Sequence, residues 1–374
     1  MTEKKREAPV GLKLPPELIY DILSLIPVRS VGRFRCVCKE WRTLLSDRQF
    51  LSRQFRLQTT KKTIFIRNSS FISIDFRNNN VNGCPPVPIY ETLNFKPASF
   101  SNSNVKSRYM ICGSCNGLLL LLHCSEGGSE LSIVNPITRE SRQLPPLPGN
   151  TKNYPCSFVF GFGYCSYADD YVVIIPVLPY SIRRPAAYMF KRNKWETIEN
   201  VPFYFHHRGA FVNGAIHSVG YDGPNRIIYA FDLAAVAFRV LELPEGLKKS
   251  KRNTIINLPM CVLGGCLCLV NELMDQETDI CEVEIWVMKE YGVRDSWTKY
   301  FFYAYHKYRF TLKTLFFWNG DGSIIGLGLE DMRLVLYSLK QNTPTSIQLI
   351  EEQSMWTFTD SLFSPNAGTS GICG

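Results

Sequence analysis

The sequence predicts a fold of the α plus all-β class, in which a small N-terminal helical module precedes a β-propeller-like domain. In the first part of the chain, apolar side chains recur at helical spacings of three and four. From about residue 63 the pattern changes to short apolar runs separated by Gly, Asn, Asp and Pro, as in strands joined by tight turns. These runs recur in similar units along the rest of the chain, which favours a repeat architecture.

The first element is expected to be a helix from the Pro15-Pro16 pair to about Ile26, ended by Pro27. Proline presets the backbone for a first helical turn, and Glu17 lies where the helix dipole favours a negative charge. One face of this helix is apolar, and it is widened by Ile19 and Leu23. The residues of that face are Leu18, Ile22, Leu25 and Ile26.

A second helix is expected to begin near Ser30, because serine is a natural N-cap. Its apolar positions, at spacings of three and four, are Val31, Phe34, Val37, Cys38 and Trp41. Helices this short cannot bury so broad an apolar surface among themselves. The module is therefore expected to bind a partner.

An ordered set of motifs in residues 13–52 goes beyond this periodicity. The motifs are Leu14-Pro15, Glu17-Leu18, Ile22-Leu23, Ile26-Pro27-Val28, Phe34-Arg35-Cys36-Val37-Cys38-Lys39, Trp41 and Asp47-Arg48-Gln49-Phe50. They closely resemble the F-box, which in its family docks onto the Skp-type adaptor of cullin-based (SCF) ubiquitin ligases. A helical hairpin that only packs on the rest of the chain would explain the periodicity but not this order of motifs.

The resemblance implies that the partners are the Skp-type adaptor and, through it, cullin. It also implies an adaptor-binding surface on the helical module. The residues of that surface would be Leu14, Pro15, Leu18, Ile22, Leu23, Ile26, Pro27, Val28 and Val31.

The formal net charge of +9 lies mostly at the N-terminal end. Residues 1–62 hold 14 Lys and Arg against 6 Asp and Glu, whereas residues 63–374 hold 28 against 27. A nucleic-acid partner would need a basic stripe on a folded face, and no such stripe is expected in the β-domain. The basic helical end instead favours an acidic protein partner, and the adaptor family that F-boxes bind is acidic.

Composition is that of a folded protein, with 45% hydrophobic residues in 374. The chain begins with charged residues rather than a signal peptide, and its thirteen cysteines are scattered and odd in number. We therefore expect an intracellular protein of the cytoplasm or nucleus, with no membrane insertion and no disulfide framework.

Five hairpin turns and five strand pairs alternate in the β-region. The turns lie at Asn116-Gly117, Ala168-Asp169, Asn213-Gly214, Gly264-Gly265 and Gly320-Asp321. The strand pairs run from Ile133 to Pro145, from Tyr188 to Ile198, from Ile228 to Leu241, from Ile285 to Lys299 and from Leu334 to Leu349.

Successive strand pairs are separated by 54, 42, 56 and 50 residues, measured between Pro136, Phe190, Asp232, Met288 and Ser338. Units of 40 to 50 residues with four strands are typical of a propeller of the kelch or WD type, so about six blades are expected. A β-sandwich would not require this order of hairpin and strand pair to recur.

The same region resembles the F-box-associated domain of plant F-box proteins. The resemblance is carried by runs at 113–118, 135–140, 160–164, 211–217 and 284–293. Ser218-Val219 departs from the family pattern, which usually has Trp after the histidine. We therefore expect a charged tail at 1–12, the F-box at 13–52, a linker at 53–62, a kelch-like propeller at 63–363 and a disordered tail at 364–374.

No constellation of catalytic, cofactor-binding or metal-binding residues is found in the sequence. Cys112 and Cys115 have redox spacing but lack a second Cys or His pair. His206-His207 and Asp169-Asp170 are adjacent residues of loops and turns, where solvated or hydrogen-bonding roles are usual. The residues therefore indicate a protein that is not an enzyme and needs no cofactor.

Together these observations predict a substrate-recognition subunit of an SCF-type ubiquitin ligase, which links an unidentified target protein to the adaptor. Two other functions stay open, a scaffold that binds the adaptor without ubiquitylation and a carbohydrate-binding or hydrolytic propeller. Tyrosine and arginine are enriched at interface hot spots. Candidate target-binding residues are Tyr180, Arg183, Arg184, Tyr303, Tyr305 and Arg309.

Overall fold

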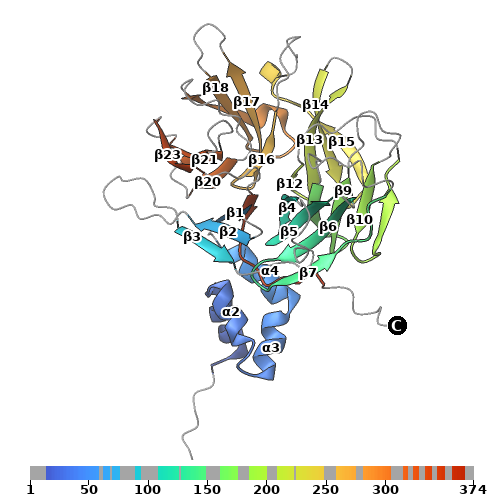
Figure 1. Ribbon diagram of the computed structural model, residues 1–374, viewed down its shortest axis with the longest axis vertical. Coiled ribbons are helices and arrows are strands. Elements are labelled where there is room, and N and C mark those ends of the chain that lie inside the picture. Colours follow the sequence, from blue (N-terminus) through green and yellow to red (C-terminus); the bar gives the residue numbers. More distant parts are fainter. Residues whose placement is uncertain are drawn as a thin grey trace, which may run out of the picture.

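The computed structural model confirms the predicted fold class, with four short helices followed by sheets of a β-propeller (Figure 1). It describes residues 14–58, 62–67, 70–75, 89–93, 108–125, 128–148, 161–175, 185–199, 209–222, 225–247, 258–274, 281–304, 315–318, 323–327, 333–338, 343–349 and 356–366. The predicted tail at 1–12 and most of the tail at 364–374 lie outside the described residues.

The helical module consists of α1 (Pro16–Leu25), α2 (Val28–Phe34), α3 (Lys39–Ser46) and α4 (Arg48–Leu57). As predicted, proline opens α1 and Pro27 follows its end. Two side chains cap the later helices. The Cys38 Sγ accepts a hydrogen bond from the Trp41 amide at 3.4 Å, and Asp47 Oδ2 accepts one from the Phe50 amide at 3.0 Å.

The expected bounds of the second helix were wrong. The second helix begins at Val28, with Pro27 rather than Ser30 at the N-cap position, because Val28 is buried and proline has no N–H that would need an acceptor there. It ends at Phe34, and Cys38 starts a separate helix that carries Trp41. Part of the stretch expected as a linker, 53–62, is helical. Helix α4 continues to Leu57 because Leu51, Gln54 and Phe55 pack inward, and β1 begins at Lys62.

The first twelve strands are β1 (Lys62–Arg67), β2 (Ser70–Asp75), β3 (Ile89–Leu93), β4 (Arg108–Cys115), β5 (Leu118–Ser125), β6 (Gly128–Asn135), β7 (Glu140–Gln143), β8 (Gly161–Cys165), β9 (Asp170–Ile175), β10 (Ala186–Met189), β11 (Lys194–Thr197) and β12 (Ala210–Val212). The others are β13 (Ala215–Asp222), β14 (Asn225–Asp232), β15 (Ala237–Leu241), β16 (Met260–Leu263), β17 (Cys266–Met274), β18 (Cys281–Met288), β19 (Trp297–Ala304), β20 (Leu315–Trp318), β21 (Ser323–Leu327), β22 (Arg333–Ser338), β23 (Thr343–Leu349) and β24 (Trp356–Phe358).

In the described part of the chain these strands form six antiparallel four-stranded sheets. Five sheets consist of four consecutive strands each, from β4–β7 to β20–β23, and the sixth joins β24 to β1, β2 and β3. The C-terminal strand β24 pairs with β1 and contacts β4, so that the two ends of the β-domain share one blade. This arrangement closes a propeller ring.

The predicted hairpins and strand pairs are confirmed. Four of the five predicted turns join the first two strands of a sheet, and all five predicted strand pairs form its last two strands. The fifth predicted turn, Gly320-Asp321, lies outside the described residues, between β20 and β21. The left-handed φ angles of Asn116 and Gly117, 50° and 71°, fit a two-residue hairpin turn. Asn213 and Gly214 repeat them at 49° and 72°.

One hydrophobic core joins the helices to the propeller. It contains Leu23, Val31 and Phe50 of the helices together with Leu120 of β5 and Leu362 of the C-terminal segment. Figure 1 shows the blue helices at one end of the molecule, with the red C-terminal segment passing next to α4. Residue 364, assigned by prediction to a disordered tail, is part of this segment, since the Ser364 hydroxyl bonds to the Glu140 carboxylate.

No helix among the described residues is long and apolar enough to cross a bilayer.

Candidate functional site

An apolar stripe formed by Leu14 and three residues of α1 is exposed to solvent. Leu14, Leu18, Ile22 and Leu25 keep 53%, 49%, 51% and 72% of their surface exposed, and we call them the α1 stripe. The last three lie at i, i+4 and i+7 on α1, so they share one side of the helix. A row of half-exposed aliphatic side chains of this kind is typical of a surface to which another protein binds.

The nine predicted adaptor-binding residues fall into two groups. Leu14, Pro15, Leu18, Ile22 and Pro27 are exposed, and Ile26 is half-buried. In contrast, the remaining three are buried in the core that joins the helices to the propeller. These are Leu23, Val28 and Val31.

Two of the most exposed apolar residues of the helical module, Leu25 and Val37, were not among the predicted site residues. Leu25 ends the α1 stripe, and its helical spacing from Leu18 was a usable signal. Val37, 63% exposed, lies in the short connection between α2 and α3. No periodic pattern distinguishes an exposed residue of a connection from a buried one, so only the fold identifies Val37.

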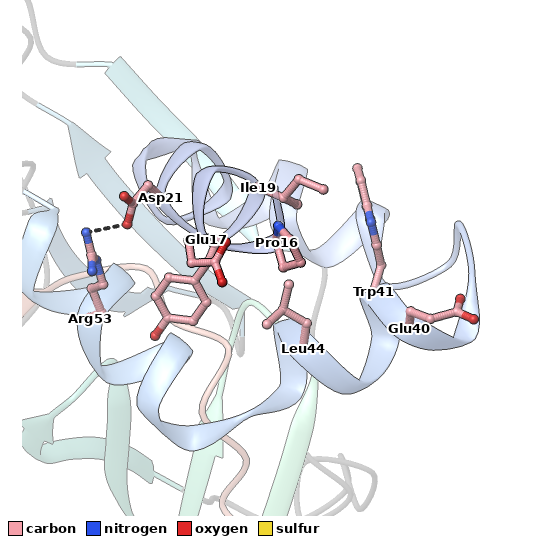
Figure 2. A pocket seen from close by; sticks show the side chains of 9 residues that line it. Pro16, Glu17, Ile19, Asp21, Glu40, Trp41, Leu44 and Arg53 are labelled. Carbon is pink, nitrogen blue, oxygen red and sulfur yellow. Dashed lines mark ion pairs between the residues drawn. The ribbon is translucent and has the colours of Figure 1, made fainter. Parts of the chain in front are cut away.

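A pocket of about 630 Å³ lies between α1, α3 and α4 (Figure 2). It is lined by Pro16, Glu17, Ile19, Tyr20, Asp21, Glu40, Trp41, Leu44 and Arg53. Figure 2 shows Trp41 and Leu44 projecting from α3 towards Pro16 of α1. Trp41 is a continuation of the core, because its ring packs edge-on against Phe34 with 5.5 Å between centroids.

Charged groups surround this pocket. Asp21 Oδ1 lies 2.8 Å from an Arg53 guanidinium nitrogen, and that guanidinium lies over the Tyr20 ring at 5.4 Å. The backbone amide of Glu40 and the Cys38 side chain lower the pKa of the Glu40 carboxyl. The helical module therefore presents an apolar stripe on one side of α1 and a pocket with acidic and basic side chains at its rim on another.

Among the residues considered for chemistry, Asp169, Asp170 and Cys115 have structural roles, whereas His206 and His207 lie outside the described residues. Asp169 pairs with Arg48 of α4, whereas the Asp170 carboxylate accepts hydrogen bonds from the amides of Tyr171 and Lys191 at 2.9 and 3.1 Å. Cys115 is buried, and burial strongly raises the pKa of its thiol. In the described ranges no group of three His, Cys, Asp or Glu residues is placed to hold a metal ion.

Nearly all predicted target-binding residues lie outside the described part of the chain. Tyr180, Arg183, Arg184, Tyr305 and Arg309 are in the segments that connect β9 to β10 and β19 to β20. Tyr303 is in β19, opposite Glu282 of β18.

Comparison with known proteins gives two family matches. The F-box domain matches residues 12–53, and the F-box associated beta propeller domain matches residues 62–364. The F-box protein CPR1 of Arabidopsis thaliana is 26% identical, over 90% of this chain and 84% of that protein. The F-box/kelch-repeat protein At3g23880 of the same plant is 25% identical, over 80% of this chain and 82% of that protein.

Proposed function

Since this chain belongs to the F-box proteins with an F-box associated β-propeller domain, we propose that it is the substrate-recognition subunit of an SCF-type ubiquitin ligase. In this role the helical module binds a Skp-type adaptor and, through it, cullin. The propeller binds a target protein, which is then ubiquitylated and degraded. The observation that supports the proposal most directly is the exposed α1 stripe within the matched F-box.

The adaptor contact is formed by a set of exposed apolar residues of the helical module. These are the α1 stripe with Pro15, Pro27 and Val37. Half-buried Ile26 lies at the margin, whereas Leu23, Val28 and Val31 support the surface from beneath. Each fully buried aliphatic side chain contributes about 1.5–3 kcal/mol, so half-exposed residues of the α1 stripe have roughly half of that still to gain.

The target is bound at the end of the propeller away from the helices. β9 starts next to Asp169, which pairs with Arg48 of α4, and runs away from the helices to Ile175. The segment with Tyr180, Arg183 and Arg184 follows Ile175. The same strand order brings the end of β19, at Ala304, to that side. A target held there leaves the adaptor surface accessible.

The chain contributes proximity rather than chemistry. Holding a target lysine near a charged ubiquitin-conjugating enzyme raises its effective concentration, while the bond is formed by other subunits. Accordingly, the purified chain is expected to form no thioester with ubiquitin when mixed with charged conjugating enzyme. A reducible ubiquitin adduct on any cysteine, including exposed Cys36 and Cys38, would contradict a non-catalytic role.

Co-purification of the chain with a Skp-type adaptor tests the proposal. Leu18→Asp and Ile22→Asp are expected to reduce the affinity at least 100-fold, because each places an unpaired charge in a buried interface. Val240→Asp is the matched control, since Val240 is 57% exposed on the propeller strand β15. Equal binding by all three variants would contradict the proposal.

Adaptor binding without ubiquitylation of any captured protein would instead indicate a scaffold. Because the adaptor and the ligase are intracellular, we infer that the chain works in the cytoplasm or nucleus.

A further inference from the structure

The segment that follows β24 lies between the helices and the propeller. Residues 359–364, which we call the strap, connect the ring-closing strand to the core of the helical module. Ser361, Leu362 and Phe363 are only 2%, 7% and 9% exposed. Burial of three consecutive residues in a segment without regular secondary structure shows that the strap is part of the shared core.

Asn135, the last residue of β6, holds the strap. Its side-chain amide donates to the Phe363 carbonyl at 2.8 Å and to the Ser361 carbonyl at 3.1 Å. Its side-chain oxygen accepts from the amides of Ile137 and Thr138 at 2.9 and 3.3 Å. Asn135 is completely buried, and both ends of its side chain are used.

Asp232 occupies the equivalent position in the blade formed by β12–β15. It ends β14 and accepts hydrogen bonds from the amides of Ala234 and Ala235 at 2.9 and 3.0 Å. The turn has the same length in both blades, since Asn135 pairs with Glu140 and Asp232 with Ala237. A carboxylate suffices for that turn. The additional function of the amide at Asn135 is donation to the strap.

The strap also packs against the helices. The Phe363 ring packs edge-on against Phe55 of α4, with 6.0 Å between centroids. A Cβ added at Gly32 of α2 would lie 3.6 Å from Leu362, so α2 passes close over the strap. By contrast, Arg48 and Asp169, which join α4 directly to the propeller, form an ion pair whose side chains are 41% and 44% exposed.

We propose that Asn135 is a positioning residue that, through the strap, fixes the orientation of the F-box relative to the propeller. This inference rests on the proposed function, because a fixed orientation holds a captured target at a constant distance from the ubiquitin-conjugating enzyme. Asn135 lies in the propeller, outside both expected binding surfaces. By fixing this orientation it influences which lysines of the target are modified.

The test compares Asn135→Asp with Asp232→Asn in the full-length chain. Asn135→Asp keeps a side-chain oxygen that accepts from the turn amides but replaces the amide group that donates to the strap. Asp232→Asn is the matched control, because it exchanges the same two side chains in the opposite direction at a position where the described hydrogen bonds stay within the turn. Genetically encoded spin labels at exposed Thr43 of α3 and Ala235 report the distance between the two domains. We expect a narrow distance distribution for the parent chain and for Asp232→Asn, and a broad one for Asn135→Asp.

A second variant distinguishes loss of the strap contact from misfolding of Asn135→Asp. Phe55→Ala removes a half-buried ring that packs on the strap and leaves Asn135 and its turn unchanged. It is expected to broaden the distances in the same way. Distances as narrow in Asn135→Asp and Phe55→Ala as in the parent chain would overturn the inference.

The functional readout is self-ubiquitylation in a reconstituted ligase, with the modified lysines of this chain identified by mass spectrometry. Asn135→Asp should bind the adaptor as the parent does but spread ubiquitin over more lysines. An unchanged lysine pattern with unchanged adaptor affinity would contradict the positioning role. A parent chain that does not bind the adaptor would contradict the proposed function, while the spin-label distances would still test the strap.

Discussion

The guanidinium of Arg48, the first residue of α4, lies 2.6 Å from the carboxylate of Asp169 in the β8–β9 turn. It also donates to the Tyr164 hydroxyl at 2.9 Å and lies over that ring at 5.3 Å. These polar contacts join the helical module to the propeller at the edge of their shared core. These contacts are half-exposed, whereas the strap is buried. We therefore expect the Arg48 contacts to contribute little to the free energy of unfolding and the strap to contribute more.

Loss of the Arg48 contacts should destabilise the chain little. Arg48→Ala is expected to lower the free energy of unfolding by about 1 kcal/mol, because water screens a half-exposed pair. Phe363→Ala should cost about 3 kcal/mol, since it opens a cavity in the shared core. Denaturant unfolding of both variants measures the difference. A larger loss for Arg48→Ala than for Phe363→Ala would show that the joint is mainly electrostatic.

Val236 is expected to be a site of backbone strain. Its φ of 52° lies in the left-handed region, which is unfavourable for a β-branched residue, and it is 43% exposed. Asn193 has a similar φ of 51° in another blade. Val236→Asn should therefore raise the free energy of unfolding by roughly 1 kcal/mol. Thermal unfolding of the variant checks this, and a lower midpoint than that of the parent would argue against strain.

His217 should make the chain less stable in acid. Its Nδ1 donates to the Ala210 carbonyl at 3.0 Å, and its Nε2 accepts from the Tyr291 hydroxyl at 2.7 Å. Burial, opposed by the bond to Ala210 and assisted by nearby Arg239, lowers its pKa to about 4. The unfolded chain, with a histidine pKa near 6.5, therefore takes up a proton first as the pH falls.

The stability that neutral His217 contributes is complete at pH 7 and is lost progressively as the pH falls from about 6.5 to 4, a loss of about 3 kcal/mol at most. Urea unfolding at pH 7 and at pH 4.5 measures it. The free energy of unfolding should fall less between pH 7 and pH 4.5 in His217→Gln than in the parent. Some fall remains in the variant, because carboxylates titrate in both chains. Equal differences would mean that His217 is not the titrating group.

The local part of this structure was predictable from sequence. Tight turns such as Asn116-Gly117 have short-range signals, and the recurrence of these turns predicted the propeller. The start of α2 was not predictable from an N-cap rule alone, because Pro27 and Ser30 are both acceptable starts and burial of Val28 decides between them. Burial of a predicted binding residue such as Val31 likewise depends on the packing of the whole domain.

The strap could not be predicted at all. Asn135 and Ser361 are 226 positions apart, and neither belongs to a motif that implies contact with the other. The joint between the two domains was therefore missed. Removal of the helices would expose Leu362 and Phe363 of the shared core, so a point substitution tests the helical module better than a truncation does.

The central claim is that the chain bridges a target to a ubiquitin ligase, and target abundance in cells tests it most directly. Proximity labelling by the intact chain and by Ile22→Asp, in which the helices remain to cover the core, identifies the captured proteins. We predict that overexpression of the intact chain lowers the abundance of a captured target. Ile22→Asp should raise it, because the variant occupies the target without delivering it. Equal lowering by both chains would contradict the bridging mechanism.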